Sequence, residues 1–167
     1  MDYQKAASFW EEKGKNSVRM EPAKLQKQIE TFIQKQNTCA LATADLEGFV
    51  RCTPLEYTYK DNCFWILSEG GLKFRGLEKN KNVSLAIYEN YNSFGNLNGL
   101  QIMGWAEIIK PWSQNYLMIL DYKHISHDAL RKMPSEMNLI QIHPTSYDFL
   151  SSDLKKEGYD SRQHLDL

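Results

Sequence analysis

The meander that decides the fold lies in residues 38–68, which read TCALATADLEGFVRCTPLEYTYKDNCFWILS. Three stretches of it can form strands: 38–44 is short and β-capable, and 49–59 and 63–68 are rich in β-branched and aromatic residues. Short turn sequences, 45–48 and 60–62, separate them, and Gly48 can take the positive φ that such turns need. Strands joined this closely pair antiparallel, because a parallel crossover needs about a dozen residues. The stretch therefore predicts a three-stranded antiparallel meander.

Three later stretches complete the set of predicted strands. They span residues 83–88, 100–109 and 139–150. In the first of them Val83, Leu85 and Ile87 alternate onto one face, as in a half-buried strand. Gly104 interrupts the second, which indicates a bulge or a close backbone approach. Residues 90–98 between the two are rich in Asn and Gly and predict a loop.

Helical spacing occurs outside the predicted strands. The predicted helices span residues 2–13, 22–36, 72–79, 112–123 and 126–132. The second begins at Pro22, whose missing N–H costs nothing in a first turn, and continues with Leu25, Ile29 and Ile33 at helical spacing. The tail over residues 151–167 is polar and carries little local pattern.

This order of elements predicts a mainly β fold with flanking helices. We expect a closed or partly closed antiparallel barrel of about six strands, in a single domain over residues 1–167. Within it, residues 1–36 form N-terminal helices, 38–150 the barrel with helical insertions, and 151–167 a C-terminal tail. A doubly wound parallel sheet fits badly, because the early strands are joined by tight turns.

Composition narrows the possible partners and compartments. Charged residues make up 25% and apolar residues 42% of the chain, and the net charge of −1 gives no bulk attraction to nucleic acid or to a membrane surface. We find neither a signal-peptide pattern nor the roughly 18 consecutive apolar residues of a membrane span. Cys39, Cys52 and Cys63 form no CxxC motif. A cytoplasmic protein with buried free thiols is the expectation.

An anion-binding site is predicted from two separate stretches. Arg51 and Thr53 are two apart on one strand, so both point to the same side. Arg51 is open to two interpretations, a partly exposed arginine on a barrel face or a clamp for phosphate. Residues 68–73, SEGGLK, end a strand and begin a helix, where backbone N–H groups and Lys73 can face an anion. Antiparallel neighbours would bring both stretches toward one end of the barrel.

Other polar residues give weaker signals. His124 and His127 lie one helical turn apart, but no nearby Cys, Asp or Glu completes a metal site, so we interpret them as surface histidines. Trp105 can serve the core, a stacking surface or a dimer interface. The chain has no GxSxG, HExxH, P-loop or GxGxxG motif. The sequence therefore names no catalytic residue.

Six short pieces follow one another along the chain: CALATAD (39–45), VRCTPL (50–55), FWILS (64–68), LKFRGL (72–77), NVSL (82–85) and GWAE (104–107). In this order and spacing they resemble the pyridoxamine 5′-phosphate oxidase-like family of FMN-binding proteins. The resemblance covers about two-fifths of the chain and implies a split β-barrel homodimer with FMN at the subunit interface.

The same resemblance implies a set of cofactor-binding residues. They are Arg51, Cys52, Thr53 and Pro54 from the second strand, Leu67 and Ser68 from the third, Lys73 after it, and Asn98 and Gln101 of the partner's fifth strand. Physical reasoning from the residues supports Arg51 and Lys73 independently. A related branch of the family binds a deazaflavin, which is the alternative cofactor.

Two departures from the true oxidases bear on the reaction. Glu56 stands where the oxidases place a lysine that meets the substrate phosphate, and an acid there would repel it. The tail reads RQHLD (162–166) and lacks the last arginine of the oxidases' Arg-x-His-x-Arg segment. Residues 158–162, GYDSR, resemble the Gly-Phe-Gly-x-Arg tail of less characterised relatives. The resemblance therefore points to general stress and nitroimidazole-resistance-type relatives and argues against vitamin B6 oxidation.

The expected function is therefore an FMN-dependent oxidoreductase. It would transfer electrons from reduced nicotinamide to a small-molecule acceptor, and the flavin itself would carry them. A non-catalytic flavin-binding stress protein or carrier shares every one of these sequence features and remains the alternative.

Overall fold

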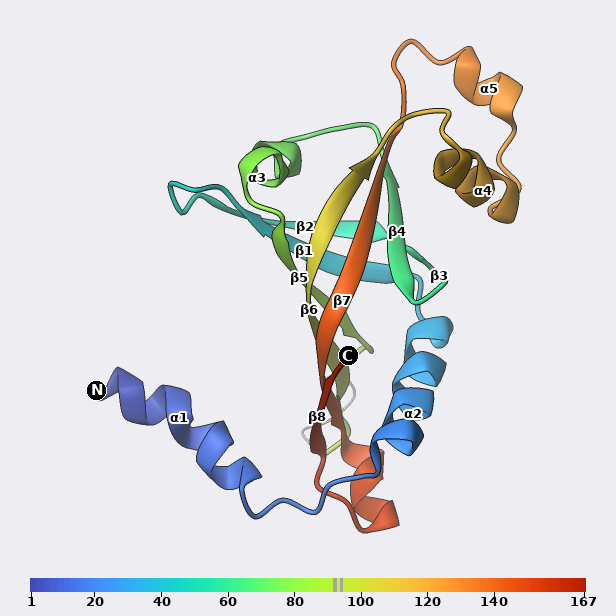
Figure 1. Cartoon of the computed structure of the whole chain (residues 1–167). Coiled ribbons are helices and arrows are strands. Elements are labelled where there is room, and N and C mark those ends of the chain that lie inside the picture. Colours follow the sequence, from blue (N-terminus) through green and yellow to red (C-terminus); the bar gives the residue numbers. More distant parts are fainter. Residues whose placement is uncertain (92, 94) are drawn as a thin grey trace.

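The computed structural model describes residues 1–91, 93 and 95–167, and it contains one antiparallel sheet with helices around it (Figure 1). The strands are β1 (Thr38–Ala44), β2 (Val50–Glu56), β3 (Thr58–Lys60), β4 (Cys63–Ser68), β5 (Asn82–Tyr88), β6 (Asn98–Ile109), β7 (Asn138–Ser151) and β8 (Arg162–Asp166). The helices are α1 (Tyr3–Gly14), α2 (Pro22–Lys35), α3 (Lys73–Lys79), α4 (Gln114–Tyr122), α5 (His127–Arg131) and the 3-10 helix η1 (Ser152–Glu157).

The strand order shows how the sheet closes. The strands are hydrogen-bonded in the order β2-β1-β5-β6-β7-β4-β3, and β8 pairs with β7. β2 and β3 lie at opposite ends of this order, although only Tyr57 separates them in the chain. The sheet therefore curls until its two ends meet, which confirms the predicted partly closed antiparallel barrel with flanking helices.

Among the described residues the sheet has eight strands instead of about six, for two reasons. The predicted strand 49–59 divides at Tyr57, whose backbone N–H donates to Asn37 O (2.9 Å) and whose hydroxyl donates to Ile33 O (2.7 Å). These bonds turn Tyr57 toward α2 and break the ladder there. The second reason is the tail, which forms η1 and then β8 where no regular element was predicted.

The core fills the inside of the curled sheet. Alternate residues of the strands point inward, and among the most deeply buried are Leu41, Phe64, Leu85, Ile102 and Ile142. α2 covers one opening of the barrel with its apolar face, which consists of Leu25, Ile29, Phe32 and Ile33. A second cluster, made by Trp65, Ile109, Leu139 and the α4 residues Tyr116, Ile119 and Leu120, lies on the outer side.

Gly104 marks a β-bulge, as predicted. The register between β6 and β7 shifts between Met103 and Gly104. A Cβ atom on Gly104 would lie 2.4 Å from His143 O, so only glycine allows the two backbones to come this close.

Helix α1 lies apart from the barrel (Figure 1). It has no buried residue, and Phe9 and Trp10 are 53% and 49% exposed. One contact links α1 to β8: the guanidinium of Arg162 in β8 lies 4.1 Å from the centroid of the Trp10 ring in α1. Within the described part of the chain, no helix has the length and apolarity needed to span a bilayer.

Candidate functional site

Arg51 and Thr53 face the inner side of the sheet. In the β1–β2 ladder Arg51 lies opposite Thr43 and Thr53 opposite Leu41, and directly opposed residues share a face. This register confirms that the two side chains point the same way. Arg51 is exposed, and it forms no ion pair or side-chain hydrogen bond with any residue that the structure describes.

Helix α3 brings Lys73 to the same end of the barrel. Gly76 packs so closely on β1 that a Cβ atom there would lie 3.2 Å from Thr43 Cβ and from Ala44 C and O. Arg75 then pairs with Asp45 at 3.1 Å, in the turn between β1 and β2. Figure 1 shows α3 beside this β1–β2 hairpin. The helix that begins at Lys73 therefore lies beside the hairpin that carries Arg51, but the predicted reason was wrong, because β2 and β4 are not neighbours in the sheet.

The loop before α3 requires its glycines. Gly70 and Gly71 have φ of 147° and 111°, values that side chains with a Cβ rarely adopt. Ser68 Oγ donates to Gly70 O and accepts from Gly70 N–H, both at 3.3 Å. Ser68 thereby fixes a tight loop at the end of β4.

Lys73 is a buried cation without an anion. Its side chain is only 5% exposed, its ammonium donates to Gly70 O, and the Phe74 ring lies 5.1 Å away. No carboxylate of the described residues pairs with it. Burial lowers the pKa of Lys73 below its ordinary value. Nearby, Thr43 Oγ1 is buried and makes no hydrogen bond to the described residues. A buried charge of this kind is costly unless an anion compensates it.

The remaining predicted residues of the second and third strands lie on the other face. Cys52 pairs with Ala42, and Pro54 with Ala40, on the outer side of the sheet. Leu67 packs against the outer cluster under α4. Their side chains therefore point away from Arg51 and Lys73, and only their backbone groups can serve a ligand at that end.

Asn98 and Gln101 are not brought to this end within one chain. Both are on β6, which β1 and β5 separate from β2. Asn98 Nδ2 donates to Glu89 at 2.8 Å, while Asn98 Oδ1 is buried without a hydrogen-bond partner among the described residues. Gln101 is exposed on the outer face. A contribution from these residues to the same ligand requires a second copy of the chain.

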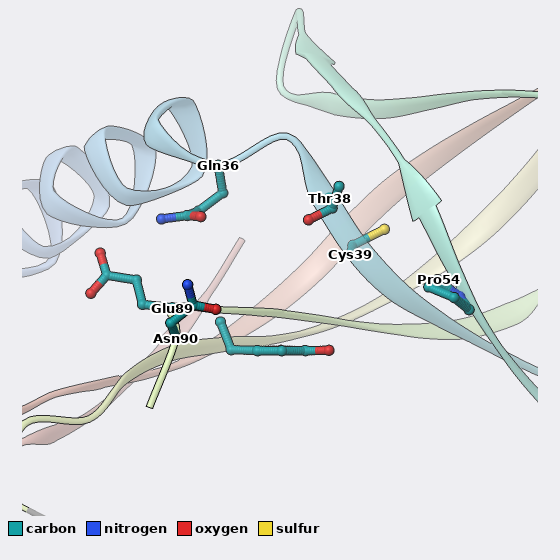
Figure 2. Close-up of a pocket in the computed structure, with 7 residues that line it drawn as sticks. Gln36, Thr38, Cys39, Pro54, Glu89 and Asn90 are labelled. Carbon is teal, nitrogen blue, oxygen red and sulfur yellow. The ribbon is translucent and has the colours of Figure 1, made fainter. Parts of the chain in front are cut away.

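A cavity of about 500 Å³ lies where the outer face meets the end of α2. It is lined by Gln36, Thr38, Cys39, Pro54, Tyr88, Glu89 and Asn90. Figure 2 shows Gln36 at the end of α2 facing Glu89 and Asn90, with Pro54 on the far side of β1. Of the predicted site residues only Pro54 lines it.

A larger groove, of about 690 Å³, lies between α1 and the outer face of the sheet. Its floor includes Ala86, Gly99 and Gln101, and Tyr88 lines it as well as the smaller cavity. Its walls come from α1 and from β8, including Arg162 and His164. Sequence reasoning missed this groove, because it joins the two termini of the chain.

The outer face of β1, β5 and β6 is otherwise uncovered. Its small residues Ala40, Ala42 and Ala86 are half-buried. Met103 and Trp105 beside them are 49% and 42% exposed, and Trp105 stacks on His143 at 3.9 Å. Large exposed apolar side chains on a flat sheet face are typical of an interaction surface.

The cysteines and histidines of the described residues form no further candidate metal site. Cys39 and Cys63 are buried, whereas Cys52 is exposed, so the prediction of buried thiols was wrong for Cys52. The cause is its place on the uncovered outer face. His127 pairs with Asp121 at 2.8 Å. Among the residues that the structure describes, no three His, Cys, Asp or Glu side chains are grouped as a metal site.

Comparisons with known proteins support the fold. The family model described as pyridoxamine 5′-phosphate oxidase matches residues 25–151. No curated protein matches the chain. Its fold resembles that of HutZ, a heme storage protein from Vibrio cholerae, at 21% identity and a TM-score of 0.60, over 76% of this chain and 91% of HutZ.

Two further solved structures share the fold. General Stress Protein 26 from Bacillus anthracis has 19% identity and a TM-score of 0.59, over 86% of this chain and 98% of that one. A FAD-binding protein from Mesorhizobium loti has 17% identity and a TM-score of 0.57, over 73% and 89% of the two chains. Likenesses at this identity establish the shared architecture.

Proposed function

Because the chain belongs to the pyridoxamine 5′-phosphate oxidase family, we propose that it is a flavoprotein that binds FMN. The cofactor phosphate would lie at the end of the barrel formed by Arg51, Thr53, Ser68 and Lys73. The observation that carries this proposal is Lys73, a cation that is buried without a carboxylate partner among the described residues. A phosphate would supply the missing negative charge.

The residues present fit a phosphate in three respects. The Arg51 guanidinium is free of protein partners in the described structure, and its planar fork matches phosphate oxygens. The orphaned Thr43 Oγ1 opposite Arg51 can donate a further hydrogen bond. Ser68 holds the glycine loop that leads into Lys73. The backbone N–H groups of Cys52 and Leu67 would complete the contacts from the strand side, whereas Pro54 has no N–H and offers only its carbonyl oxygen, to a donor on the flavin.

The proposal includes a homodimer with the flavin between the subunits. The uncovered outer face, with Met103 and Trp105 exposed, supports self-association. Asn98 and Gln101 lie away from the phosphate end of their own chain, so they would contact the flavin bound by the partner. The unsatisfied Asn98 Oδ1 is consistent with such a role.

We propose oxidoreductase activity, with reduced nicotinamide as donor and a small molecule as acceptor. Bound FMN supplies the hydride and electron transfer chemistry, and the chain supplies binding, orientation and electrostatics. Glu56 supports a substrate other than a vitamin B6 phosphate, because it is an acid at the edge strand and pairs with Lys123 at 2.7 Å. A deazaflavin in place of FMN, and a carrier without turnover, are the alternatives.

The name of the Vibrio cholerae relative suggests heme binding as another function. His164, the histidine that lines the larger groove, supports heme binding less well than the anion site supports FMN. His164 Nδ1 lies 2.8 Å from Asp148 and its Nε2 lies 3.1 Å from Asp166. The hydrogen bond to Asp148 raises the pKa of His164 above its ordinary value, and this favours the imidazolium form. Iron ligation requires an unprotonated ring nitrogen.

The test is an absorption spectrum of the purified protein after incubation with FMN and desalting. Retained oxidised-flavin bands in a species of twice the chain mass support the proposal. A colourless protein overturns it, and a Soret band after the same procedure with heme would transfer the assignment to a heme protein. Bleaching by NADH or NADPH, followed by acceptor-dependent recovery, distinguishes an enzyme from a carrier.

A further inference from the structure

We propose that the groove between α1 and the outer sheet face binds a phosphorylated nucleotide, the chemical class of the reduced nicotinamide donors. The role as donor site rests on the proposed function, whereas the binding of the nucleotide itself does not. The groove has about 690 Å³, within the range of small-molecule sites.

The first argument is charge. Lys13, Arg19, Lys155 and Arg162 line the groove, and within the described structure none of these four side chains pairs with a carboxylate. Of the groove's two acids, Asp148 is bonded to His164 and Asp160 accepts from the Val18 backbone N–H at 2.8 Å. The groove lining therefore contains more cationic than carboxylate side chains, although the chain as a whole has a net charge of −1. Such a surplus attracts phosphate groups.

The second argument is a flat platform on the wall of the groove. The Arg162 guanidinium lies 4.1 Å from the centroid of the Trp10 ring, and Lys13 Nζ lies 4.9 Å from it. Trp10 is nevertheless half-exposed, so ring surface remains for another flat group. Purine and nicotinamide rings stack on indole and guanidinium planes in this way.

The third argument is the floor opposite Trp10. Ala86 and Gly99 leave room above the strands because their side chains are minimal. Aromatic wall, small-residue floor and cationic rim together match a ligand with a ring and phosphates.

The experiment measures binding of ADP-ribose, a redox-inert dinucleotide fragment, to the flavin-free full-length protein by calorimetry. We expect saturable binding that Arg162→Ala weakens by about tenfold, because it removes a phosphate contact and half of the stacking platform. Lys155→Gln leaves the Trp10–Arg162 stack in place and should weaken binding by about threefold. Arg131→Ala is the matched control, because Arg131 stacks on Trp112 at 4.0 Å away from the groove.

Three results would overturn the proposal. The first is the absence of ADP-ribose binding. The second is an affinity that neither Arg162→Ala nor Lys155→Gln changes. The third is an affinity for inorganic phosphate alone that equals the affinity for ADP-ribose. Arg51→Ala distinguishes this site from the flavin site: it should weaken FMN binding and leave ADP-ribose binding unchanged. If FMN fails to bind while ADP-ribose binds as described, the flavin proposal fails and the nucleotide site stands.

Discussion

Arg51 lies directly opposite Thr43 in the β1–β2 ladder, and the Thr43 hydroxyl is buried without a hydrogen-bond partner in the described structure. An unpaired buried hydroxyl is unusual, since buried polar groups are generally satisfied, and the Arg51 guanidinium is exposed and unpaired in the described structure. Helix α3, which packs on Thr43 through Gly76, adds the buried Lys73 ammonium. This cluster, and not any single motif, is the basis for an anion site at this end of the barrel.

Lys73→Met separates stability from function. We expect the flavin-free protein to become more stable by about 1–2 kcal/mol, because an uncompensated buried charge is removed, while FMN binding weakens by about tenfold or more. Denaturant unfolding and flavin titration measure the two effects. If the variant loses stability and keeps its flavin affinity, Lys73 is a structural residue.

The pH dependence of this effect has a defined sign. Burial lowers the pKa of Lys73 from its ordinary 10.5, so the unfolded chain binds the proton more tightly than the folded one. The destabilisation is complete below the lowered pKa and disappears as pH rises toward 10.5. The stability gain of Lys73→Met should therefore shrink over that alkaline window.

Gly104→Ala should destabilise the fold strongly. The added methyl group would lie 2.4 Å from His143 O, and backbone at a β-bulge has little freedom to move. We expect a loss of about 2–3 kcal/mol in denaturant unfolding. Gly95→Ala is the control, because no heavy atom of the described residues lies within 4 Å of its added methyl group. Equal stability of the two variants would contradict the close β6–β7 approach.

The thiols should differ sharply in reactivity. Burial raises the pKa of Cys39 to about 12, so almost no thiolate forms at pH 8. Cys52 is exposed on the outer face. Mass spectrometry after iodoacetamide treatment should find Cys52 modified first and Cys39 protected until the protein unfolds. Modification of both at the same rate would mean that β1 is not packed as described.

His164 should titrate above its ordinary pKa of 6.5, because Asp148 and then Asp166 hydrogen-bond to its imidazole. The pair stabilises β8 fully below pH 6.5, and this contribution fades as pH rises through the raised pKa. NMR titration of the imidazole in wild type and in Asp148→Asn tests this expectation. The variant should titrate closer to 6.5, and an unchanged midpoint would remove Asp148 as the cause.

The sequence predicted the barrel well where the pattern is local. Alternation along residues 38–44 and 83–88 follows the side-chain period of a strand, and the Asp45–Gly48 turn sets the β1–β2 register. The same alternation continues through Tyr57, so nothing local signals the break between β2 and β3. That break depends on hydrogen bonds to Ile33 in α2 and to Asn37, which lies between α2 and β1.

The site could be predicted only in part for the same reason. Arg51 and Lys73 could be proposed because their signals are local: a charged residue within a predicted strand, and two glycines followed by a lysine at the start of a predicted helix. The outward direction of Leu67 depends on the packing of α4, and the groove depends on contact between Trp10 and Arg162 from opposite ends of the chain. β8 is five residues long and finds its partner in β7, so its polar sequence carries no sufficient period.

FMN titration of wild type and Arg51→Ala tests the central claim most directly. Arg51 is exposed and without protein partners in the described structure, so its replacement should leave the melting temperature of the flavin-free protein unchanged. The account predicts that FMN affinity falls by about 1.5–3 kcal/mol, the loss of a charge-assisted phosphate contact. Equal affinities for FMN in the two proteins would contradict it and would place the phosphate elsewhere.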